Sequence, residues 1–198
     1  MADSVNEIES MSKRLSKYLD TNRYYHTQGV RFISAALAMA HGTDIRKAET
    51  AGLLHDCAKC LSDSKKIKIC DKNEIEITDV ERENPFLLHA KVGAYIAEEK
   101  YGIHDEEILD AIRYHTTGRP GMRHLEQIVF IADYIEPRRN KSKRLPEIRM
   151  EAFRDLDECC YLILKDMLIY LHSKSSEIEP HTQEAYHFYE EVHEERRD

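Results

Sequence analysis

Apolar residues recur along this chain at spacings of three and four, which is the pattern of amphipathic α-helices. Ile8, Met11 and Leu15 follow that spacing, and a second run continues it over 30–40 until Gly42. Because successive residues of an α-helix are 100° apart, residues at this spacing share one face. The pattern constrains the chain to bury its apolar surface between helices.

The alternation that predicts a strand occurs only over 75–78, which is too short to build a sheet. The 198 residues show no internal repeat and no linker rich in Gly, Ser or Pro. We therefore expect one all-α domain over 1–198, a bundle of seven or more helices. The expected helices are 8–19, 22–41, 44–60, 63–70, 85–101, 104–115, 125–135, 148–171 and one that begins at Pro180.

Charge and hydropathy limit the partners and the location of the protein. The formal net charge is -8, which argues against a surface for duplex nucleic acid. No stretch approaches the roughly 20 apolar residues of a membrane helix, and the acidic N-terminus is unlike a secretory signal, so we expect a cytoplasmic protein. One basic stretch is either a solvated loop or a collar for a polyanion: Arg138, Arg139, Lys141, Lys143, Arg144 and Arg149.

The five cysteines do not suggest a disulfide framework, because their number is odd. Cys57 and Cys60 form a C-x-x-C that we place inside a helix, with no second pair to complete a zinc site. We interpret the cysteines as ordinary thiols.

Imidazole and carboxylate side chains interrupt five apolar helical segments. A single histidine on an apolar face is usually a satisfied core residue, and a buried charge is costly unless it is paired or bound to a metal. Five segments that each deliver such a group predict a shared polar centre. Its members are His26, His55, Asp56, His89, His115 and Asp133.

This mixture of nitrogen and oxygen ligands suits Fe, Mn, Zn or Co better than Ca or Mg alone. A metal there can make a bound water acidic and so supply hydroxide for attack on phosphorus. Lys59 follows His55 by four residues and Asp56 by three, so a helix would project it from the same face, toward substrate phosphate.

The order His26, His55-Asp56, Asp133 resembles the HD-domain signature. Within that superfamily the chain is most similar to the bacterial YqeK-type family. Three segments carry the likeness: AGLLHDCAK at 51–59, AIRYHTTG at 111–118 and IADYIEPRR at 131–139.

The resemblance implies an enzyme, a symmetrical bis(5′-nucleosyl)-tetraphosphatase, which converts diadenosine tetraphosphate to two ADP by attack of a metal-activated hydroxide. It implies a divalent metal, with iron expected and Mn, Co or Zn as alternatives. The metal ligands would be His26, His55, Asp56 and Asp133.

The same resemblance assigns the remaining site residues. His89 and His115 would contact phosphates or a second metal, and Arg139 would bind phosphate. Pro180, His181 and Thr182 belong to a helical segment, 146–198, that would close over the nucleotide.

Other functions stay open from the sequence. The same metal site would serve another HD phosphohydrolase, such as a nucleotidase or a phosphodiesterase. A nucleotide-sensing module without turnover is a further alternative from a different class. The expected helix 148–171 could pack a homodimer or only the core.

Overall fold

The computed structural model describes residues 2–140, 142–174 and 177–196. Within these ranges all regular structure is helical, as the apolar spacing predicts, and there is no strand. The helices are α1 (Ala2–Leu15), α2 (Thr21–His41), α3 (Ile45–Leu54), α4 (Asp63–Lys72), α5 (Asp79–Glu83), α6 (His89–Tyr101), α7 (Glu106–Tyr114), α8 (His124–Ile135), α9 (Leu145–Glu151), α10 (Leu156–Ser173) and α11 (Pro180–Glu195).

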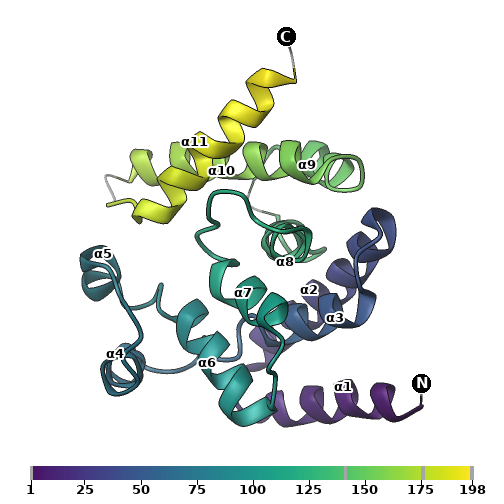
Figure 1. The fold of residues 1–198 in the computed structure, drawn as a ribbon, viewed down its shortest axis with the longest axis vertical. Helices are drawn as coiled ribbons and strands as arrows, with labels where there is room; N and C mark the ends of the chain where they lie inside the picture. The colour runs from purple at the N-terminus through teal and green to yellow at the C-terminus, as the bar shows by residue number, and fades with distance from the viewer. Residues whose placement is uncertain (1, 141, 175–176, 197–198) are drawn as a thin grey trace.

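Helix α8 lies at the centre of the molecule (Figure 1). Of its residues only His124, Asp133 and Tyr134 escape full burial. The helix packs against α2, α3 and α7 on one side and against α10 on the other. A helix that is apolar almost all round must be enclosed in this way. Asp133 therefore lies on a central helix and faces His26 of α2 and His55, which follows α3.

Helices α2 and α3 approach each other closely because Gly52 has no side chain. A Cβ at Gly52 would lie 2.7 Å from Ser34 Oγ and 3.1 Å from Arg31 Cα. Asp44 starts α3 by accepting hydrogen bonds from the backbone N–H groups of Arg46 and Lys47. The close approach at Gly52 packs the C-terminal part of α3 against the middle of α2, and His55 and Asp56 directly follow α3.

The prediction of one long helix over 148–171 is wrong. The chain instead forms α9 and α10, separated at residues 152–155. Asp155 ends the continuity because its side chain accepts a hydrogen bond from Glu158 N, which is the geometry of a helix N-cap. The apolar spacing runs through the break, so periodicity alone did not reveal it.

Two other local predictions also need correction. Residues 55–60 form successive turns after α3, so Cys57 and Cys60 do not lie in a helix. Residues 85–88 are turns as well, and α6 begins at His89. The short helix α5 was not expected; Thr78 and Glu81 start it with a capping box.

None of the described helices is both long enough and apolar enough to cross a membrane.

Candidate metal centre

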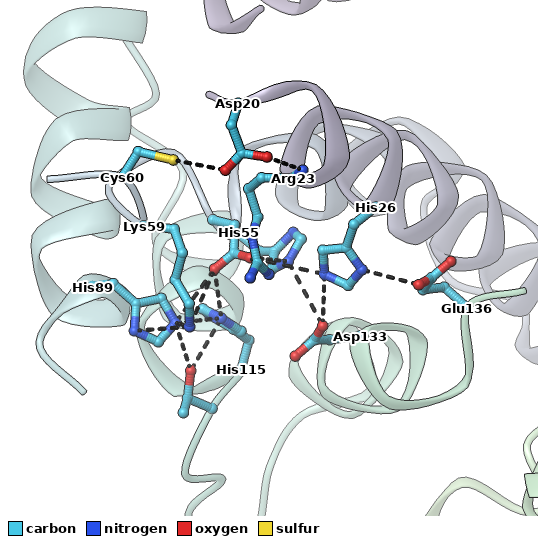
Figure 2. A network of polar contacts seen from close by, with 12 residues as sticks. Asp20, Arg23, His26, His55, Lys59, Cys60, His89, His115, Asp133 and Glu136 are labelled. Carbon is cyan, nitrogen blue, oxygen red and sulfur yellow. Dashed lines mark hydrogen bonds and ion pairs between the residues drawn. The ribbon is translucent and has the colours of Figure 1, made fainter. Parts of the chain in front are cut away.

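Five elements converge on one point, as the spacing of the polar residues predicts. His26 comes from the second turn of α2, and His55 and Asp56 directly follow α3. His89 is the first residue of α6, and His115 directly follows α7. Asp133 reaches in from α8 (Figure 2). The structure therefore gathers all six predicted residues in one cluster.

His26, His55 and the two aspartates form the first half of the cluster. His26 Nε2 lies 2.9 Å from Asp133 Oδ1 and 3.8 Å from Asp56 Oδ2. His55 Nε2 lies 3.4 Å from Asp56 Oδ2 and 3.9 Å from Asp133 Oδ1. Each imidazole thus turns Nε2 toward both carboxylates, and all four residues face one small volume.

The orientation of the imidazoles is fixed from behind. His55, His89 and His115 each donate Nδ1–H to the backbone carbonyl three residues earlier, at 2.7 Å in every case. A carbonyl oxygen only accepts, so Nδ1 must carry the proton. Nε2 is left to face the centre, which is the arrangement seen in histidines that bind metals.

A cation fits the first half because polar atoms there lack partners. His26 Nε2, His55 Nε2 and Asp56 Oδ1 are buried and form no hydrogen bond with the described residues. His26 Nε2 is near Asp133, but the two groups are not aligned as a hydrogen bond. Unpaired buried polar atoms are costly, and a shared metal ion would satisfy them together. The ligand atoms of His26, His55 and Asp56 all lie within 4.8 Å of one another.

Asp56 also belongs to a second half of the cluster. Its Oδ1 lies 3.4 Å from His89 Nε2 and 3.8 Å from His115 Nε2. These two Nε2 atoms are 3.2 Å apart, and Lys59 Nζ lies 3.0 Å from His89 Nε2. Thr116 Oγ1 is 3.1 Å from both imidazoles. A carboxylate that faces two ligand sets can bridge two cations.

The two halves differ in their electrostatics. Burial lowers the pKa of His115 to about 4, aided by His55, and burial with Lys59 holds the pKa of His89 well below its ordinary value. Burial opposes charge on His55, but the carboxylate of Asp56 outweighs it and raises the His55 pKa. The carboxylates thus draw a positive charge to the first half, while the imidazoles of the second half stay neutral.

Comparison with known proteins agrees with this geometry. The family model of the HD domain matches residues 23–138 of the sequence, a range that includes every residue of the cluster.

The chain belongs to the HD-domain family.

Two relatives are similar to this chain over 85% or more of its length. The symmetrical bis(5′-nucleosyl)-tetraphosphatase of Bacillus subtilis (strain 168) is 40% identical over 170 residues, 85% of this chain and 89% of that protein. The protein of the same name from Staphylococcus aureus (strain NCTC 8325 / PS 47) is 38% identical over 181 residues, 90% of this chain and 92% of that protein. These relatives confirm the YqeK-type resemblance.

A solved structure extends the likeness to three dimensions. It is that of a protein from Clostridium acetobutylicum described as a predicted HD superfamily hydrolase involved in NAD metabolism. The two chains superpose with a TM-score of 0.90 at 37% identity, over 93% of this chain and 97% of the other. The all-α HD fold is therefore shared along almost the full length.

Two arginines border the HD centre, and the sequence identified only one of them. Arg139 Nη2 lies 2.5 Å from Asp133 Oδ1, and its Nε donates to the Asp133 carbonyl. Arg23 Nη1 donates to Asp56 Oδ2 at 2.7 Å. Arg23 lies in the first turn of α2, three residues before His26, so it lies close to His26 on that helix. Both guanidinium groups are partly exposed and can meet an anion.

Glu136 is a further residue of the HD centre that the sequence did not single out. Its Oε1 accepts from His26 Nδ1 at 3.1 Å, and its Oε2 accepts from Arg138 N at 2.8 Å. Gly29 makes room for it, since a Cβ there would lie 2.8 Å from Glu136 Oε2. Glu136 thus orients His26 as the backbone carbonyls orient the other histidines.

Several residues of the basic stretch after α8 form hydrogen bonds or ion pairs within the protein. Arg149 donates to the carbonyls of Ile135, Glu136 and Arg139, and so holds the loop that carries Arg139. Arg144 pairs with Glu147 and Asp166. Lys143 is exposed, and Lys141 lies outside the described residues. Of the six basic residues, Arg139, Arg144 and Arg149 are therefore held by partners in the described structure, and a collar for a polyanion stays a prediction.

The described lining of the two cavities that border the HD cluster does not include the predicted closing residues. His181 lines a cavity of about 450 Å³ with Tyr114, Lys91 and Arg113, and no cluster residue lines that cavity. Thr182 is buried, at 3% exposure, and Pro180 opens α11 on the surface. A role of these residues in binding nucleotide stays a prediction.

Proposed function

We propose that this chain hydrolyses diadenosine tetraphosphate symmetrically to two ADP. One observation carries the proposal: a complete HD cluster with unsatisfied ligand atoms, in a chain similar along 85–90% of its length to enzymes of that name. Water adds across the anhydride between the second and third phosphorus atoms, and each half leaves as ADP.

His26, His55, Asp56 and Asp133 would hold a divalent transition metal, with iron favoured and Mn, Co or Zn as alternatives. Two imidazoles and two carboxylates are a donor set that such ions accept. When bound, the ion acts as a Lewis acid that polarises phosphoryl oxygens and makes water more acidic.

The two arginines and Lys59 suit the polyphosphate. Arg139 pairs with Asp133 at 2.5 Å, and Arg23 pairs with Asp56 at 2.7 Å. A cation that neutralises the carboxylates would free both guanidinium groups for phosphate oxygens. Lys59 Nζ lies 3.9 Å from Asp56 Oδ1, and burial lowers its pKa. These three groups would stabilise the charge that develops as the anhydride breaks.

His89 and His115 suit a second cation better than phosphate. Each uses its Nδ1–H on a backbone carbonyl, so a neutral ring turns only the Nε2 lone pair toward the centre. A phosphate oxygen is itself an acceptor and gains nothing from a lone pair. A metal ion, or the ammonium of Lys59 at 3.0 Å from His89, is the partner that this geometry favours.

The test is product analysis after incubation of purified protein with diadenosine tetraphosphate and Fe(II), Mn(II) or Co(II). Anion-exchange chromatography separates the nucleotides. ADP as sole product supports the proposal. AMP plus ATP would retain a hydrolase and reject symmetrical cleavage. Binding without turnover with every metal would favour another HD phosphohydrolase or a sensing module.

A further inference from the structure

A second feature adjoins the HD cluster, a cavity of about 560 Å³ between α8, α10 and the loop that joins α8 to α9. This volume lies in the range of sites that bury small organic ligands, roughly 300–1,000 Å³. Both polar and apolar side chains line it, and the two kinds lie on different sides of the cavity. They are His115, Thr116, Phe130, Asp133, Tyr134, Arg139, Ser142, Leu145, Ile163, Asp166, Met167 and Tyr170.

The cavity is polar where it meets the cluster and apolar along α10. His115, Asp133 and Arg139 belong to the HD centre or border it. On the other side, Ile163, Met167 and Tyr170 come from one face of α10, at spacings of four and three. Arg139 at one end and the apolar face of α10 at the other suit a ligand with an anionic end and a flat or apolar end.

A second cavity, of about 430 Å³, begins on the other side of Arg139 and has a different lining. All of its lining residues are polar or charged: Asp20, Asn22, Arg23, His26, Glu136, Arg138, Arg139 and Asn140. Among the described residues that line it, none is aliphatic, and the imidazole of His26 is the one aromatic ring. The centre is therefore asymmetric, with a half-apolar cavity on one side and a polar, arginine-bearing one on the other.

We propose that the cavity along α10 binds the base and sugar of one nucleotide of the substrate, with Tyr170 against the base. The inference rests on the proposed function, since it assumes a nucleotide substrate. A purine has an apolar face that stacks on aromatic rings and an edge with N–H donors. The nucleotide's diphosphate would run to Arg139 and the cluster.

Asp166 supplies a polar group at the apolar end of this cavity. Its carboxylate is held by Arg144 Nη1 at 2.8 Å and by Ser142 Oγ at 3.4 Å, and its side chain is only 15% exposed. A carboxylate has lone pairs to spare after these two contacts. Asp166 can accept from the N–H edge of a base, which neither phosphate nor an apolar ligand offers.

The chain offers a matched pair of variants for the test. Tyr170 and the adjacent Ile169 are both 62% exposed on α10, but only Tyr170 lines the cavity. Binding of ADP and of pyrophosphate to Mn(II)-loaded protein is measured by calorimetry. Tyr170→Ala should weaken ADP binding by about tenfold, as expected from loss of one base–aromatic contact. It should leave pyrophosphate binding unchanged within about twofold, since pyrophosphate has no base.

Ile169→Ala should change neither affinity, and Tyr170→Phe should retain ADP binding. Equal weakening of ADP and pyrophosphate, or no effect of Tyr170→Ala on ADP, would overturn the inference. Failure of the proposed function looks different, because wild-type protein would then bind ADP without cleaving diadenosine tetraphosphate. Cleavage of that substrate with unaltered ADP binding in Tyr170→Ala would reject the inference alone.

Discussion

The Glu136→Gln substitution probes how firmly the HD centre is preorganised. Glu136 is buried at 1% exposure and accepts two hydrogen bonds, one on each carboxylate oxygen. Glutamine has one acceptor oxygen, so either His26 Nδ1–H or Arg138 N–H would face an NH₂ group. The structure therefore predicts that one of the two donors loses its partner and that His26 loses a negative neighbour.

The expected loss of metal affinity can be estimated from residues that hydrogen-bond to metal ligands in other proteins. Their loss typically lowers metal affinity by about 10- to 100-fold, which is about 1.4–2.7 kcal/mol. We expect Glu136→Gln to weaken Mn(II) binding within that range, as measured by calorimetric titration of chelator-treated protein. Thermal unfolding of the metal-free variant checks that the fold is intact.

Glu147→Gln is the matched control, because Glu147 pairs with Arg144 on the surface and its side chain is 57% exposed. An exposed ion pair contributes little to stability, and Glu147 has no described contact with a residue of the HD cluster. The control should therefore bind Mn(II) as wild type does. Wild-type affinity in a folded Glu136→Gln protein would refute the argument that Glu136 orients His26.

Three further predictions concern Gly52, Asp56 and His115. Gly52→Ala should lower the free energy of unfolding by about 1–3 kcal/mol in urea titrations, because its Cβ would meet Ser34 Oγ at 2.7 Å; an unchanged midpoint would contradict the close approach. Mn(II) should raise the melting temperature of wild type and not of Asp56→Asn, since only wild type presents the complete cluster; an equal rise in both would place the ion elsewhere. In metal-free protein the pKa of His115, lowered to about 4 from 6.5, makes the unfolded state bind more protons, so stability present above pH 6.5 should fall toward pH 4; a free energy of unfolding that stays flat from pH 6.5 to 5 would count against it.

The helical fold could be predicted because its signal is local. Apolar spacing gave α2, α7 and α8 close to their observed bounds, and Pro180 marked the start of α11. The break between α9 and α10 was missed, since the Asp155 cap is a single residue within an apolar pattern that continues. The turns at 55–60 were missed for a related reason: the residues favour a helix, and tertiary contacts at the cluster decide otherwise.

Some residues of the candidate site could be identified from the sequence, and others could not. His26, His55, Asp56, His89, His115 and Asp133 stand out because each is a polar group in an apolar segment. Arg23 and Glu136 do not, because their contacts with Asp56 and His26 join elements far apart in sequence. Glu136 lies 110 residues from His26 along the chain. Only packing, including the space left by Gly29, reveals that pair.

We propose that one buried HD cluster performs metal-dependent hydrolysis of the tetraphosphate. The most direct test is the rate of ADP formation from diadenosine tetraphosphate as a function of metal concentration, in wild type and in Asp56→Asn that is shown to be folded. We predict a rate that saturates with metal in wild type, vanishes with chelator and is absent from the variant. ADP formation at the wild-type rate in Asp56→Asn, or in wild type stripped of metal, would contradict the account.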